Sequence, residues 1–200
     1  MLGLMLMMLF ASGPTALIGV TPGVTAQDIQ SSIQSASPAS PRSTQGTQSH
    51  RGVRLGAEAA AYFSQFKAAD TAVRKSNAAL IVSIGLERGF KPRSCAIAVA
   101  TSIQETGLRN LNWGDADSKG LFQQRPSVIS WGTAAQIMQR SHAINQFYDR
   151  LLWYPYRDTR PMIETAIRVQ RPNPTFYHRD WKWDTIATEI VEFYSASKGG

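Results

Sequence analysis

The hydrophobic and polar positions divide the chain into three stretches. Residues 1–26 are mainly apolar and end in the small-residue pattern Val24-Thr25-Ala26, residues 27–54 are rich in Ser, Gln, Thr, Pro and Gly, and apolar residues at helical spacing begin at Leu55. A stretch with almost no large apolar side chains buries too little surface to offset the entropy lost on ordering. The pattern therefore predicts a targeting or anchoring segment over 1–26, a disordered linker over 27–54 and one folded domain over 55–200.

Two interpretations of the first stretch stay open. It is either a signal peptide cleaved after Ala26 or an uncleaved membrane anchor interrupted by Ser12-Gly13-Pro14. The apolar run from Met1 to Phe10 has no preceding Lys or Arg, which departs from the usual signal peptide. Both interpretations predict export, with the folded domain outside the cell, in the cell wall or held at the outer face of the cell membrane.

The domain shows helical periodicity throughout. Apolar residues recur three and four positions apart in several stretches, which is the spacing of a helix with one buried face. The predicted helices cover 55–66, a stretch ending at Gly89, Pro92 to the terminator Gly107, a stretch capped by Ser141, 161–170 and 183–193. Period-two alternation is confined to a small hairpin or loop within 112–124. The predicted fold class is therefore all-α, or at most α+β through that hairpin.

The positive charge belongs almost entirely to the predicted domain. The 200-residue chain carries a formal net charge of +7, and only Asp28 and Arg42 are charged within the first fifty residues. A basic domain favours an acidic polymer as partner, and nucleic acid, an anionic membrane and a bacterial cell wall all meet that description.

Cysteine and histidine usage argues against a disulfide and a metal site. The single cysteine, Cys95, cannot form an internal disulfide, and it lies in a stretch of Ala, Ile and Val that is typical of a buried side chain. His50, His142 and His178 do not have the spacing of a metal-ligand motif. We therefore predict that the protein uses no metal.

The most informative residue is Glu105, which follows the apolar stretch 95–104. A polar segment punctuated by glycine comes next and contains Ser118-Lys119-Gly120-Leu121-Phe122-Gln123. Burial at the end of a helix disfavours the ionised carboxyl group and raises its pKa, which suits a general acid. The pattern predicts an active site where Glu105 meets this segment.

This arrangement resembles the lysozyme-like superfamily, specifically the group of soluble lytic transglycosylases and goose-type lysozymes. In that group a helix ends in Glu-Ser or Glu-Thr and a Gly-Leu-x-Gln turn follows. The string from Gln104 to Ile137 is more similar still to the lysozyme-like domains of actinobacterial cell-wall proteins and their phages, and the resemblance covers roughly 80–183. It implies a helical domain that cleaves the β-1,4 bond between N-acetylmuramic acid and N-acetylglucosamine in peptidoglycan, with Glu105 as general acid and base and no cofactor.

The resemblance also implies where substrate binds. Ser118 and Gln123 match positions that line the cleft, Ser118 against the acetamido group of the reacting sugar. The distal segment 166–177 resembles the part of the family that returns to the cleft opposite Glu105, which implies roles for Gln170 and Tyr177.

Aromatic and basic side chains add candidates for glycan binding. Trp113, beside the loop, is the tryptophan we expect to stack on a sugar ring. We expect three further tryptophans to pack in the core, namely Trp131, Trp153 and Trp181. Three basic residues are candidates for muramyl-peptide carboxylates, with solvated surface charge as the ordinary alternative: Arg109, Lys119 and Arg125.

The second carboxylate decides the reaction type. Hydrolysis by the usual routes needs a partner at about 5 Å for retention or about 6.5–9.5 Å for inversion, and Asp115 and Asp117 are the candidates, although Asp is also a common turn former. A lytic transglycosylase needs no partner because the C6 hydroxyl of the muramic acid attacks. We expect a lytic transglycosylase in preference to a hydrolase, and both stay open.

Two alternatives belong to other functional classes. A non-catalytic peptidoglycan-binding module would keep the cleft for docking alone, and a basic helical DNA-binding protein would need an exposed recognition helix. The export-like N-terminus and the apolar helix faces speak against the latter. The predicted partners are therefore peptidoglycan glycan strands and, through the N-terminal segment, the membrane, without nucleic acid.

Overall fold

The structure is a computed structural model that describes residues 53–127, 131–171 and 181–197. All of these belong to Gln48–Gly200, the second of the two units into which the chain divides. The described residues are 62% helical and 3% strand and form no sheet, so the predicted all-α fold class is confirmed. The N-terminal segment and nearly all of the predicted linker lie outside the described residues, as does Tyr177.

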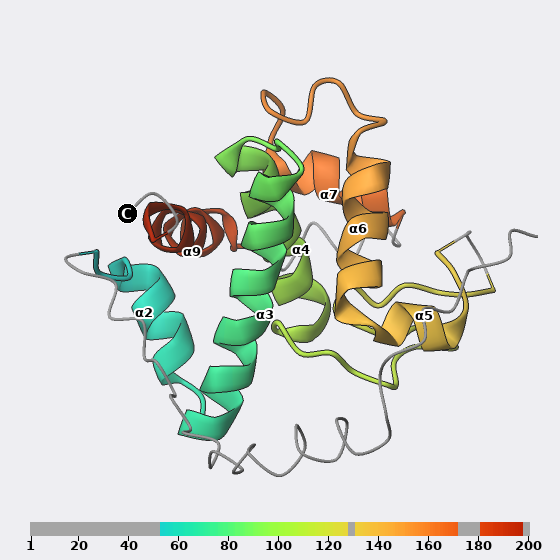
Figure 1. Cartoon of the computed structure of the whole chain (residues 1–200), viewed down its shortest axis with the longest axis horizontal. Coiled ribbons are helices and arrows are strands. Elements are labelled where there is room, and N and C mark those ends of the chain that lie inside the picture. Colours follow the sequence, from blue (N-terminus) through green and yellow to red (C-terminus); the bar gives the residue numbers. More distant parts are fainter. Residues whose placement is uncertain (1–52, 128–130, 172–180, 198–200) are drawn as a thin grey trace, which may run out of the picture. The chain divides into compact units, whose positions relative to one another are not determined.

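Helices supply almost all the regular structure of the described residues (Figure 1). They are α2 (Ala57–Ser64), α3 (Ala68–Glu87), α4 (Pro92–Thr106), α5 (Ala134–Met138), α6 (Arg140–Leu151), α7 (Met162–Gln170) and α9 (Asp184–Ala196). Among them, none has the length and apolar character needed to cross a lipid bilayer.

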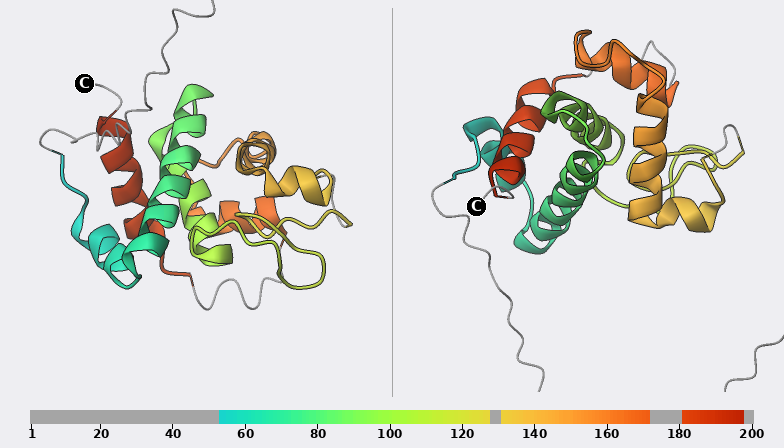
Figure 2. Two further views of the ribbon diagram at one scale, coloured as in Figure 1. Left: turned by 60° about the horizontal axis from the view of Figure 1, so that its bottom comes forward. Right: turned by 45° about the horizontal axis from the view of Figure 1, so that its top comes forward.

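Helix α4 is the central element. Every residue from Ser94 to Ile103 is buried, and the helix packs against α3, α6, α7 and α9. Figures 1 and 2 show α3 and α4 side by side. Most of this stretch consists of small or β-branched side chains, which allow neighbouring helices to approach α4 on several sides.

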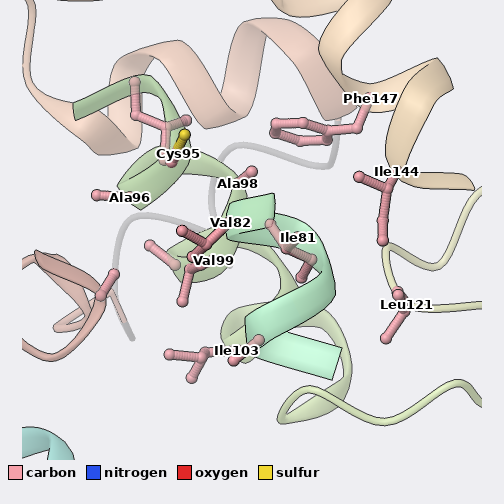
Figure 3. Packing of buried hydrophobic residues seen from close by; sticks show 14 of the residues in the cluster. Ile81, Val82, Cys95, Ala96, Ala98, Val99, Ile103, Leu121, Ile144 and Phe147 are labelled. Atoms are coloured by element: carbon pink, nitrogen blue, oxygen red, sulfur yellow. The ribbon is translucent and has the colours of Figure 1, made fainter. Parts of the chain in front are cut away.

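The core joins α4 to α3 and α6. Ile81 of α3, Val99 of α4 and Phe147 of α6 belong to one cluster of buried side chains (Figure 3). The ring of Phe147 also stacks on Phe122 at 4.6 Å between centroids, which holds the segment after α4 against the core. Each such fully buried side chain contributes about 1.5–3 kcal/mol to the free energy of folding. Cys95 is also buried, as predicted.

Both predicted ends of α4 are confirmed. Pro92 occupies the first turn, where its missing N–H costs no helical hydrogen bond. Gly107 ends the helix at φ +60°, and a Cβ at this position would collide with the guanidinium of Arg74. Glycine is therefore required both by the left-handed backbone and by the close approach of α3.

Three details differ from the sequence-based predictions. The short helix α5 was not predicted, and a capping box between Thr133 and Gln136 stabilises its start. Ser141 was wrong as a cap, because Gln139 takes the extended conformation that begins α6 and so puts Ser141 inside the first turn. The segment 112–124 is a loop with isolated bridges, Leu111 with Gly120 and Lys119 with Gln124, rather than a hairpin of strands.

Candidate active site

Glu105 is the second-last residue of α4 and is half-buried. The helix end around it is hydrogen-bonded to the turn that the sequence singled out. Ser102 Oγ and Thr106 Oγ1 both donate to the carbonyl oxygen of Leu121, at 3.1 and 3.0 Å. The helix end and the Gly120-Leu121-Phe122 turn therefore form one hydrogen-bonded unit.

Gln170, the last residue of α7, completes the surroundings of Glu105. Its Nε2 lies 3.3 Å from Glu105 Oε1 and also donates to the carbonyl oxygen of Phe122. The Gln170 amide thus links α7 both to the end of α4 and to the Phe122 turn, and it orients the Glu105 carboxyl group. The resemblance implied that Gln170 lies opposite Glu105, and the two side chains are in contact, while a role of Gln170 in binding substrate stays a prediction.

The amide of Gln170 also presents an acceptor. Its Oε1 is buried, and no hydrogen bond from the described residues reaches it. An unpaired buried acceptor carries a desolvation cost of about 1–3 kcal/mol. A hydroxyl or amide of a substrate bound beside Glu105 could offset that cost.

Helix α3 holds the end of α4 from the other side. Arg74, only 5% exposed, donates to the carbonyl oxygen of Gly107, and Asn77 Nδ2 donates to that of Leu108 at 2.7 Å. Arg140 Nη1 in turn donates to Asn77 Oδ1 at 2.8 Å. These side chains satisfy carbonyl groups at the end of α4 that have no partner within the helix.

These supporting residues were missed in the sequence analysis. Arg74 and Asn77 lie at helical spacing with the buried Ala78 and Ile81, so they occupy the apolar face of α3. A basic and an amide side chain at such positions need buried hydrogen-bond partners. Their place on an apolar helix face therefore predicts that they bind polar groups of a neighbouring segment.

Ser118 and Gln123 shape the loop that follows α4. Ser118 is buried, and its backbone N–H donates to the carbonyl of Asp115 at 3.0 Å. Gln123 has a left-handed backbone with φ +48°, and its Nε2 lies 3.3 Å from the carbonyl oxygen of Trp113. The Gln123 amide covers Gly114, where a Cβ would collide with it. Both residues therefore fix the loop conformation, and their contacts with substrate stay predictions.

Asp117 is held by hydrogen bonds within the same loop. Its carboxylate accepts hydrogen bonds from Arg125 Nε and from the Ser127 N–H, each at 2.9 Å. The hydrogen bond from Arg125 is the main cause that lowers the pKa of Asp117 to about 2, and those from Ser127 add to it. Such a carboxylate is a weak general base. Asp115 is exposed, and its carbonyl closes the turn to Ser118.

The tryptophans divide between core and surface. Trp131 is buried, and the centroid of its ring lies 4.0 Å from the guanidinium carbon of Arg150. Trp181 is partly buried, and its Nε1 donates a hydrogen bond to Asp184 Oδ1. The expectation that Trp153 packs in the core was wrong, because it follows the end of α6 and is 63% exposed. Trp113 is 64% exposed on the loop after α4, so its ring is accessible.

Two of the three basic candidates are engaged within the loop. Arg125 pairs with Asp117, and Lys119 Nζ donates to the carbonyl oxygen of Asn112 at 2.9 Å. The backbone N–H of Arg109 donates to Thr106 Oγ1 at 3.2 Å. These contacts give Lys119 and Arg125 a structural role, and binding of peptide carboxylates by any of the three stays a prediction.

A cavity of about 610 Å³ lies close to this site without including Glu105. Ile103, Gly107, Tyr62 and Trp183 line it. Positions two residues from Glu105 are about 200° away around a helix, so this cavity opens on the opposite face of α4. We therefore place the candidate site by the contacts of Glu105 rather than by this cavity.

Comparison with known proteins adds no assignment: no family model matches the chain, and no curated protein matches it. Within residues 53–127, 131–171 and 181–197, no group of three or more His, Cys, Asp or Glu side chains is placed to hold a metal ion. His142, one of the scattered histidines, is hydrogen-bonded through Nε2 to the carbonyl of Trp131 at 2.9 Å.

Proposed function

We propose that this protein is an exported peptidoglycan-cleaving enzyme that acts on the β-1,4 bond between N-acetylmuramic acid and N-acetylglucosamine, with Glu105 as general acid and base. The observation that carries the proposal is the meeting of Glu105, Gln170 and the turn at Phe122. These are segments that the resemblance associates with one cleft. Placement of the acid on a buried helix supported from α3 and α7 gives it the fixed geometry that proton transfer needs.

The chemistry we propose is that of a lytic transglycosylase. Protonated Glu105 gives its proton to the glycosidic oxygen as the bond to C1 of the muramic acid breaks. The C6 hydroxyl of the same sugar then attacks C1, and the Glu105 carboxylate accepts the hydroxyl proton. The products are a free N-acetylglucosamine end and a 1,6-anhydro-muramic end, and no water is consumed.

The loop carboxylates support this choice over hydrolysis. A hydrolase would need a second carboxylate as base or nucleophile. Asp117 is held by Arg125 and Ser127, with its pKa lowered to about 2, and Asp115 is exposed at a turn. A mechanism with one carboxylate needs neither Asp115 nor Asp117 as a base or nucleophile.

The alternative is a wall-binding module without catalysis, which the exposed ring of Trp113 would also suit. Release of soluble fragments from purified sacculi by the full chain separates the two functions. We expect release by the wild type, a loss of about a thousandfold in Glu105→Gln, and near wild-type release in Asp115→Asn, the matched removal of an exposed carboxylate.

Folding must be monitored in the same experiment by melting temperature, which we expect to be unchanged because the Glu105→Gln exchange is nearly isosteric. Sedimentation of the Glu105→Gln variant with sacculi should persist. Sacculi bound by the wild type without any soluble product would favour the binding module. Near wild-type release by Glu105→Gln would overturn the acid assignment.

A further inference from the structure

A second cavity, of about 320 Å³, lies where the segment after α6 meets α7. That segment, residues 152–161, is the orange loop that joins α6 to α7 in Figure 1. The cavity is lined by loop residues that include Tyr154, Tyr156, Arg157 and Arg160, and by Arg168 of α7. Its size is at the lower end of the range of about 300–1,000 Å³ for small-molecule pockets.

The cavity lining is strongly basic. It contains three arginines, Arg157, Arg160 and Arg168, and no acidic residue. Arg160 pairs with Glu164 at 3.3 Å on the exposed side. For Arg157 and Arg168 the described part of the chain offers no carboxylate partner, and Arg157 as a whole is half-buried.

Arg157 is the most confined of these groups. Its Nη1 donates to the carbonyl oxygen of Tyr154 at 3.2 Å, and its guanidinium lies 5.8 Å from the centroid of the Phe90 ring. Its Nε is buried, and no described acceptor reaches it. A buried donor of a charged group without an acceptor is costly, and an anion in the cavity would reduce that cost.

The nearest loop carboxylate is directed elsewhere. Asp158 accepts a hydrogen bond from Ser94 Oγ at 2.8 Å and lies 3.8 Å from Lys91 Nζ, at the N-terminus of α4. Arg93 Nη2 also donates to the carbonyl of Arg160 at 2.7 Å. The start of α4 thus holds the loop in position and compensates its acidic residue, which leaves the cavity positive.

We propose that this cavity binds the phosphate group of a small phosphate ester. Guanidinium groups match the oxygens of phosphate in geometry and charge, and two arginines that line this cavity have no carboxylate partner in the described residues. The rings of Tyr154 and Tyr156 supply flat walls for a glycerol or sugar carried by the phosphate. The site is separate from Glu105 and independent of the cleavage proposed for it.

Calorimetric titration of the full chain with glycerol 3-phosphate tests the soluble form of this ligand, with glycerol as the neutral comparison. Flotation with vesicles of phosphatidylcholine, with and without phosphatidylglycerol, tests a glycerol phosphate ester that is presented as a lipid headgroup, here as a phosphodiester. Arg168→Gln is the primary variant because Arg168 is exposed and its loss should not affect folding, and Arg157→Gln is the second. Arg54→Gln removes the same charge from an exposed position outside the cavity and is the matched control.

We expect binding of one phosphate-ester probe to weaken about tenfold in each cavity variant and to be unchanged in Arg54→Gln. Binding of glycerol 3-phosphate would identify a soluble ester as the source, whereas binding confined to the phosphatidylglycerol vesicles would identify a headgroup. The proposal is overturned if neither probe binds, if glycerol binds as well as its phosphate, or if Arg54→Gln weakens binding as much as the cavity variants.

Discussion

The two sides of the candidate active site are built in different ways. On one side, Glu105 lies in the last turn of a buried helix, and Arg74 and Asn77 of α3 hold the carbonyl groups of the two residues that follow this helix. On the other side, the loop after α4 keeps its shape through polar contacts near the surface, such as the pair of Asp117 and Arg125. Loss of a buried polar contact lowers the stability of a protein far more than loss of an exposed ion pair does. Glu105 therefore has a rigid support, and the loop is the part that can vary.

The substitution with the largest expected effect is Arg74→Met, on the buried side of the site. The substitution leaves the Gly107 carbonyl and Asp70 without their partner and removes the guanidinium that lies 3.6 Å from the centroid of the Phe66 ring. We expect a loss of about 3 kcal/mol in the free energy of unfolding, measured in denaturant. Lys75→Met, at the next and exposed position of α3, should cost less than about 0.5 kcal/mol. Equal losses in both variants would contradict the claim that buried contacts from α3 support the end of α4.

Gln170→Leu tests the contribution of α7. The side chain keeps a similar volume but no longer donates to Glu105 or to Phe122. We expect the rate of fragment release from sacculi to fall roughly tenfold to a hundredfold, with a stability loss of about 1–2 kcal/mol from the unpaired Phe122 carbonyl. Glu164→Gln, in the first turn of α7, serves as the control and should retain activity. An unchanged rate in Gln170→Leu would show that Glu105 is oriented without α7.

Substitutions in the loop after α4 should reduce activity less than substitutions at the end of α4 or in α7. Asp115→Asn and Asp117→Asn should each reduce the rate of release less than about tenfold, because neither carboxylate takes part in the proposed reaction. A loss of about a thousandfold in either variant, at an unchanged melting temperature, would contradict the mechanism with one carboxylate. A melting temperature that falls together with the rate would identify the residue as a turn former.

The smallest effect concerns the ionisation of Asp117. Its pKa is lowered to about 2 in the folded protein, so the ion pair with Arg125 stabilises the fold above the ordinary pKa of Asp and this contribution is lost as the pH falls toward 2. A carboxyl NMR titration should show a midpoint near 2, and Arg125→Gln should move it up toward about 3.9. A midpoint near 3.9 in the wild type would mean that the pair does not form in solution.

The elements around Glu105 were predictable because they depend on local signals. Pro92 and Gly107 mark the two ends of α4, and the helix predicted to reach Gln170 ends there. Helix α5 escaped prediction because it spans only one turn and has a single buried residue, Ile137, so it shows no periodicity. Short elements depend on their caps, and here the cap is the pair of Thr133 and Gln136.

The side chains that hold the end of α4 in place could not be predicted from local signals, because the groups they contact are distant in the sequence. Arg74 reaches Gly107 across 33 residues, and Gln170 reaches Glu105 across 65. Trp153 was expected in the core because most tryptophans pack there, whereas α6 ends before it and its side chain is exposed. A pattern along one helix specifies its buried face and leaves the partner of each polar side chain unspecified.

The central claim is that Glu105 alone drives cleavage, with the hydroxyl of the substrate as the attacking group. The most direct test is the mass of the fragments that the full chain releases from purified sacculi in water labelled with ¹⁸O. The account predicts 1,6-anhydro-muropeptides without incorporated ¹⁸O, and their absence from a digest with Glu105→Gln. Reducing muramic ends that carry ¹⁸O would contradict it, because they would show that water is the attacking group and that a second catalytic group has been overlooked.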